Sequence, residues 1–193
     1  MMDGRVIYYI PDNNIEHNIL FDTCAINKIM KAEKFMKKVK KMKELGFDYY
    51  ISAALMRELK GVVDRKVGGM QVYDNVKEEN ERVFDFINEI NGKRVSSLAL
   101  LLQNYWVLDG SFRSIDKNAD TYAMFNEIHH NNIHHLKDAV IAEAAIHNNC
   151  TLVTNDKRLN KKVNSHFANR SMLCEEFEEK INLLLKEGEE NGR

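Results

Sequence analysis

One stretch, residues 136–159 (LKDAVIAEAAIHNNCTLVTNDKRL), restricts the fold of this chain more than any other. Its first half has four apolar residues at the spacing of a helix face: Val140, Ile141, Ala144 and Ala145. Residues 150–153 then form a short apolar and β-branched run without alternation, which is typical of a parallel strand buried on both faces. Asp156 follows this strand closely. Ligands of open parallel sheets bind beyond the C-terminal ends of the strands, so we expect Asp156 to be functional.

The same order of strand, acid and helix occurs earlier in the chain. An apolar run at residues 18–21 is followed directly by Asp22, and residues 25–30 have helical character. The second unit therefore also delivers a carboxylate to the C-terminal end of a strand. Two such units predict an α/β fold with a central parallel sheet.

Two further acids belong to this pattern. Residues 47–52 predict another strand, and Ser52 is suited to cap a helix that carries Glu58 about two turns further on. Asp138 stands at the start of the helix that leads into the strand at 150–153. We expect both carboxylates near the edge of the sheet that Asp22 and Asp156 occupy.

We expect residues 1–193 to form one domain, because a domain has roughly 100 to 200 residues. Residues 64–113 predict a helical insertion, with helices at 76–90 and 95–108; the second is apolar nearly all round, contains Trp106, and is a candidate homodimer face. The other predictions are an edge strand at 5–10, a basic amphipathic helix at 32–45 ended by Gly46, a helix at 119–128, a strand at 171–173 and a helix at 174–186.

Composition narrows the class of protein. The chain is 44% hydrophobic and 30% charged and has a single proline, which is typical of a largely helical globular protein. No apolar run approaches the roughly 20 residues of a membrane span, and the N-terminus lacks the apolar core of a signal peptide, so we expect a cytoplasmic protein without a membrane partner. The three cysteines are widely spaced among apolar residues, which favours reduced core thiols over disulfides.

Four carboxylates at one sheet edge, Asp22, Glu58, Asp138 and Asp156, need a cation between them, because like charges and burial would otherwise raise their pKa values. Hard oxygen ligands without histidine or thiolate favour Mg²⁺ or Mn²⁺ over zinc. Such a site suits hydrolysis of a phosphodiester, in which one ion activates the attacking water and a second, ~4 Å away, stabilises the leaving oxygen.

Two polar segments leave alternatives open. The net charge of −1 gives no global attraction for nucleic acid, so any such contact must be local. A basic cluster after Asp156 is either a contact for the RNA backbone or a solvated turn: Lys157, Arg158, Lys161 and Lys162. The run HHNNIHH at residues 129–135 is read as a polar loop in preference to a zinc site, since no cysteine lies nearby.

Four segments, FDTCAINKI, ISAALMREL, KDAVIAEAA and TLVTNDKRL, resemble the four acidic motifs of the PIN-domain ribonucleases, in order and in local spacing. The resemblance covers roughly residues 18–62 and 115–180. It implies a three-layer α/β/α sandwich around a parallel sheet. It also implies metal-dependent, endonucleolytic cleavage of single-stranded or structured RNA that leaves a 5′-phosphate and a 3′-hydroxyl. The metal-binding and catalytic acids would be Asp22, Glu58, Asp138 and Asp156, and Thr154 would help to hold them.

Many members of this family are toxins of toxin–antitoxin pairs, so the resemblance also implies an inhibitory protein partner. The chain departs from the family pattern at Cys174, where small hydroxyl residues or proline are commoner, and in the insertion at 64–113, which makes it longer than many of these toxins.

Two alternatives compete with a nuclease. A phosphatase similar to the haloacid dehalogenases would need a second aspartate two residues after Asp22, and the chain has Cys24 there. A PIN-like fold could also act as a non-catalytic binding module for nucleic acid or protein. The loss of one of the four acids would indicate such a module, and all four are present. A dinucleotide-binding site is excluded because no glycine-rich turn follows any predicted strand.

Overall fold

A computed structural model of the chain describes residues 15–56, 81–95, 119–130, 132 and 135–190. Two expectations from the sequence therefore lie outside the described residues: the edge strand at 5–10 and the position of Glu58. Most of the expected insertion at 64–113 is likewise not described, apart from residues 81–95. Among the described helices, none has the length and hydropathy of a transmembrane segment.

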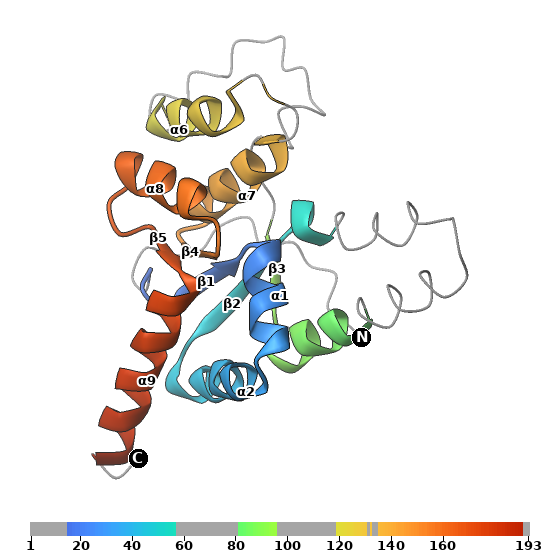
Figure 1. The fold of residues 1–193 in the computed structure, drawn as a ribbon, viewed down its shortest axis with the longest axis vertical. Helices are drawn as coiled ribbons and strands as arrows, with labels where there is room; N and C mark the ends of the chain where they lie inside the picture. The colour runs from blue at the N-terminus through green and yellow to red at the C-terminus, as the bar shows by residue number, and fades with distance from the viewer. Residues whose placement is uncertain (1–14, 57–80, 96–118, 131, 133–134, 191–193) are drawn as a thin grey trace.

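The described residues form a five-stranded sheet with the order β3-β2-β1-β4-β5, in which every neighbouring pair is parallel (Figure 1). The strands are β1 (Asn18–Phe21), β2 (Asp48–Ser52), β3 (Lys93–Val95), β4 (Thr151–Thr154) and β5 (Ser171–Leu173). The two strands predicted to deliver acids, β1 and β4, pair with each other at the centre of the sheet. This confirms the α/β class and the central parallel sheet.

Helices cover both faces of this sheet. The longer labelled helices are α1 (Thr23–Lys31), α2 (Glu33–Met42), α6 (Ala119–His129), α7 (Leu136–His147), α8 (Lys157–His166) and α9 (Cys174–Glu190). The short helix η2 (Lys43–Leu45) follows α2, and residues 53–56 and 81–89 are also helical. Figure 1 shows α6, α7 and α8 together on one side of the sheet and α1 and α2 on the other. The buried hydrophobic residues also form two clusters, one under α1, α2 and α9 and one under α6, α7 and α8. The predicted three-layer α/β/α sandwich is therefore confirmed.

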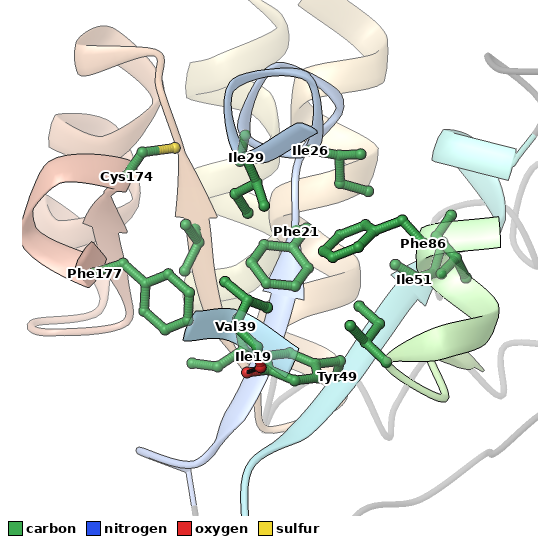
Figure 2. Close-up of a cluster of buried hydrophobic side chains, with 14 of the residues drawn as sticks. Ile19, Phe21, Ile26, Ile29, Val39, Tyr49, Ile51, Phe86, Cys174 and Phe177 are labelled. Atoms are coloured by element: carbon green, nitrogen blue, oxygen red, sulfur yellow. Dashed lines mark hydrogen bonds between the residues drawn. The ribbon is translucent and has the colours of Figure 1, made fainter. Parts of the chain in front are cut away.

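Successive side chains of β1 point to opposite faces of the sheet, and this produces two separate hydrophobic clusters, one on each face. Ile19 and Phe21 belong to the cluster shared with α1, α2 and α9, whereas Leu20 belongs to the cluster shared with α6, α7 and α8. All three side chains are fully buried, as expected for a strand with helices on both faces. In Figure 2, the ring of Phe21 lies among side chains of the first cluster, including Ile29 and Phe177.

The structure differs from the sequence-based prediction at the edge of the sheet. Residues 93–95, expected within a helical insertion, form strand β3 beside β2, so the helix predicted from Val95 does not begin there. The strand has only three residues and buries only Val95, so it is too short to show a strand pattern. A close approach just before β3 favours glycine at position 92, because a Cβ atom there would lie 3.0 Å from the Ile87 side chain.

Candidate active site

Asp22 and Asp156 come together because β1 and β4 are adjacent and parallel. The Asp22 backbone N–H donates to the Val153 carbonyl (3.0 Å) at the ends of the two strands. Each acid is also the N-cap of the helix that leaves its strand. Asp22 Oδ1 accepts from the Thr23 N–H (2.6 Å), and Asp156 Oδ1 accepts from the Arg158 N–H (2.8 Å). The local fold therefore fixes the orientation of both carboxylates.

Thr154 links these two acids through hydrogen bonds. Its hydroxyl donates to Asp22 Oδ2 (2.8 Å) and accepts from the backbone N–H of Asp156 (3.0 Å). Thr154 is fully buried and Asp22 is only 6% exposed, so solvent cannot easily replace these bonds. The hydroxyl thereby sets the spacing between the carboxylate after β1 and the backbone after β4.

Cys24 is a second support for Asp22, and sequence reasoning treated it only as a core thiol. Its Sγ donates to Asp22 Oδ2 (2.9 Å) and accepts from the Asn155 N–H (3.1 Å). Burial and the negative charge of Asp22 raise the pKa of the Cys24 thiol to about 11, so it remains a protonated donor at neutral pH. The position of Cys24 two residues after Asp22, in the first turn of α1, is the signal that could have identified it.

Asp138 joins the pair from a third element, the first turn of α7. Burial raises the pKa of its carboxyl, and the negative charges of Asp22 and Asp156 raise it further, whereas Arg158 and His135 act in the opposite direction. Asp138 also lies beside Asp156, because the same guanidinium nitrogen of Arg158 is 3.0 Å from Asp138 Oδ2 and 4.0 Å from Asp156 Oδ2. Three of the four predicted acids thus gather at one edge of the sheet, and the fourth, Glu58, lies outside the described residues.

Arg158 is the cation at the centre of this cluster. Its Nη2 lies 3.0 Å from Asp138 Oδ2, 3.0 Å from His135 Nδ1 and 4.0 Å from Asp156 Oδ2. His135 Nδ1 is also 3.7 Å from Asp138 Oδ2. His135 belongs to the histidine-rich run expected to be a polar loop, and its contact with the acids was not predicted.

The other predicted basic residues lie differently. Lys162 Nζ donates to the backbone carbonyl of Glu127 in α6, so this lysine is engaged with a neighbouring helix. Lys157 and Lys161 are exposed on α8. Of the four candidates for the RNA backbone, Arg158 alone is in contact with the acid cluster among the residues that the structure describes.

The chemistry of the donor set fits a hard divalent cation. Asp22, Asp138 and Asp156 offer carboxylate oxygens, which Mg²⁺ and Mn²⁺ prefer. Within the described ranges, no group of three or more acids, histidines or cysteines is drawn together closely enough to hold a metal ion as it stands. In the described structure, the Arg158 guanidinium is the positive group that lies beside the carboxylates of Asp138 and Asp156.

The family model for the PIN domain matches residues 19–164, which is more than half of the chain. The chain belongs to the PIN domain family. PIN domains are generally nucleases that act on nucleic acids, and they typically use divalent metals. No curated protein and no solved structure matches the chain. The PIN match includes the three gathered acids, Thr154 and Glu58.

Replacing Thr154 by valine should test the link between the two capping acids. Valine has nearly the same shape but leaves Asp22 Oδ2 and the Asp156 N–H without the hydroxyl, so we expect the free energy of unfolding to fall by about 1–3 kcal/mol. Urea denaturation would measure the change. Thr154→Ser is the matched control, because it keeps the hydroxyl and loses the methyl group that valine retains. A loss in Thr154→Ser as large as that in Thr154→Val would contradict the special contribution of these hydrogen bonds.

Proposed function

We propose that this PIN domain is a metal-dependent endoribonuclease that hydrolyses phosphodiester bonds of RNA. The observation that carries the proposal is the gathering of Asp22, Asp138 and Asp156 at the C-terminal ends of β1 and β4, where Thr154 joins Asp22 to Asp156 and Arg158 lies between Asp138 and Asp156. Arg158 offsets part of this negative charge, and a divalent cation bound to the carboxylate oxygens would offset the rest. Glu58, by its place in the family motif, is the proposed fourth acid.

We assign separate roles to the acids, which would bind the metal, and to the residues that hydrogen-bond to them. Asp22, Glu58, Asp138 and Asp156 would hold Mg²⁺ or Mn²⁺, which when bound lowers the pKa of the attacking water and neutralises charge on the phosphate. Thr154 and Cys24 keep Asp22 in one orientation by donating to the same oxygen, Oδ2. No nucleophilic side chain is required, and the raised pKa of Cys24 makes its thiol a poor one.

RNA would reach this edge of the sheet past the exposed side of α8. Lys157 and Lys161 are exposed there, and contacts of lysine to backbone phosphates give affinity without reading sequence. Arg158 and Lys162 remain further candidates for the same role. A role as a toxin with an inhibitory protein partner is supported by the family resemblance, and a homodimer is suggested by the apolar segment around Trp106, which lies outside the described residues.

Two competing functions are less well supported. A phosphatase of the haloacid-dehalogenase kind needs a carboxylic acid two residues after Asp22, and the group at that position is the Cys24 thiol, which donates to Asp22 itself. A non-catalytic module would have no need to hold three carboxylates together against their repulsion. We therefore place both below the nuclease.

Product analysis tests the proposal. Single-stranded RNA and DNA of one mixed sequence, labelled at either end, would be incubated with purified protein and Mn²⁺. We expect internal cleavage of the RNA without a 2′,3′-cyclic phosphate, because water is the nucleophile, and with the 5′-phosphate and 3′-hydroxyl ends that the family resemblance implies. Products ending in 2′,3′-cyclic phosphate would contradict this mechanism. Equal cleavage of the DNA would retain the nuclease but overturn its assignment as a ribonuclease.

A further inference from the structure

Arg158 contacts the acid cluster through both its backbone and its side chain. It is the second residue of α8, and its backbone N–H helps Asp156 to cap that helix through Oδ1 (2.8 Å). Its guanidinium turns back to Asp138 Oδ2 (3.0 Å), on a different helix. The side chain is 39% exposed, so it can leave this position for solvent without disturbing the core.

One oxygen of each acid, Asp138 and Asp156, faces Arg158. In Asp156, Oδ1 accepts the N–H groups of Arg158 and Leu159, which leaves Oδ2 on the side of the guanidinium, 4.0 Å from Nη2. In Asp138, Oδ2 is the oxygen bound to the same nitrogen. Nη2 therefore occupies a point where a single positive group is attracted by both acids.

A divalent cation would compete for these oxygens. Mg²⁺ binds carboxylate oxygens at about 2.0–2.1 Å, so an ion that takes the side of Asp138 Oδ2 facing Arg158 would need the place that Nη2 holds, 3.0 Å from that oxygen. Two cations on the same side of one oxygen repel each other in a partly buried site. The ion and the guanidinium therefore compete for this position, and the more mobile group is the half-exposed side chain of Arg158.

We propose that Arg158 is the built-in counter-ion of the acid cluster and exchanges with the metal. Without metal, its guanidinium neutralises Asp138 and Asp156 and keeps them near each other. When a divalent cation binds, the guanidinium leaves Asp138 and becomes available to a phosphate of the RNA backbone. This positioning role rests on the proposed metal-dependent function, and it makes metal affinity depend on the strength of the contact between Arg158 and Asp138.

Binding of Mn²⁺ alone, without RNA, tests this exchange. The free-ion signal in electron paramagnetic resonance would be titrated for the wild type, Arg158→Gln, Arg158→Lys and Lys161→Gln. Removal of the competing cation should make Arg158→Gln bind Mn²⁺ about 5-fold tighter or more. Lys161→Gln removes the same charge from the exposed face of the same helix, and its affinity should stay within about 2-fold of the wild type. Arg158→Lys keeps a cation and should bind Mn²⁺ less tightly than Arg158→Gln.

Each other outcome has a defined meaning. Unchanged or weaker Mn²⁺ binding by folded Arg158→Gln would overturn the exchange and leave the proposed nuclease intact, as would equal tightening in Lys161→Gln. The absence of Mn²⁺ binding in every protein, including the wild type, would overturn the proposed metal-dependent function and the exchange together. If Arg158→Gln does not fold, Arg158→Met, which also removes the charge, takes its place: Mn²⁺ binding about 5-fold tighter than that of the wild type would support the exchange, and unchanged binding would overturn it.

Discussion

Asp22→Asn is expected to reduce the rate of RNA cleavage by at least about 10²-fold, which is the scale of losing one preorganised electrostatic group of an active site. Asp22 is the most deeply buried of the described acids in the cluster, 6% exposed, and it follows the central strand β1 directly. Asparagine keeps a carbonyl oxygen for the Thr23 N–H but removes the negative charge. The fold should survive, because the substitution also removes repulsion with Asp138. Initial rates at saturating Mn²⁺ and circular dichroism would measure the two effects.

Asp48→Asn is the matched control for this substitution. Asp48 begins β2 at the opposite end of the sheet, where its partner is Lys93 at 2.8 Å, so the same loss of charge should leave cleavage unchanged. Near-full activity of Asp22→Asn with Mn²⁺ or Mg²⁺ would show that our assignment of Asp22 is wrong.

Phe177→Ala is expected to lower the free energy of unfolding by about 3–5 kcal/mol, as large-to-small changes of buried aromatic residues do. Phe177 lies on α9, is fully buried, and its ring centroid is 5.8 Å from that of Phe21 and 6.2 Å from that of Phe35. Figure 2 shows the ring beside Phe21 in the core. Truncation would open a cavity between α9, β1 and α2. Urea denaturation monitored by circular dichroism would measure the loss.

Leu183→Ala provides the comparison on the same helix. Leu183 is 61% exposed, and its replacement should change the free energy of unfolding by less than about 0.5 kcal/mol. A loss below about 1 kcal/mol for Phe177→Ala would contradict the packing of α9 against the sheet.

The central strands could be predicted from the sequence because burial on both faces leaves a strong local signal. Residues 19–21 and 150–153 are continuous apolar or β-branched runs, and each is followed by an acid that caps a helix. Strand β3 could not be predicted in this way, because its three residues include two partly exposed basic side chains. Its place is decided by pairing with β2, which is a long-range interaction without a pattern in the local sequence.

The candidate site was predictable in part for the same reason. The positions of Asp22 and Asp156 follow from their places just after strands β1 and β4. The position of Asp138 follows from its place at the start of the helix before β4. The contact of Arg158 with Asp138 spans 20 residues and depends on how α7 and α8 pack, which periodicity does not determine. The hydrogen bond from Cys24 to Asp22 depends on a side-chain rotamer, and a thiol among apolar residues indicates only burial.

We propose above all that this PIN domain cleaves RNA through a divalent metal held by its carboxylates. One preparation of wild-type protein would be assayed on labelled single-stranded RNA with Mn²⁺, after addition of excess EDTA, and again after Mn²⁺ is restored, with Asp22→Asn purified and assayed in parallel. We expect cleavage that stops with EDTA and returns with Mn²⁺, and no cleavage by the variant at any stage. Cleavage that persists in EDTA, or that the variant shares, would contradict the claim.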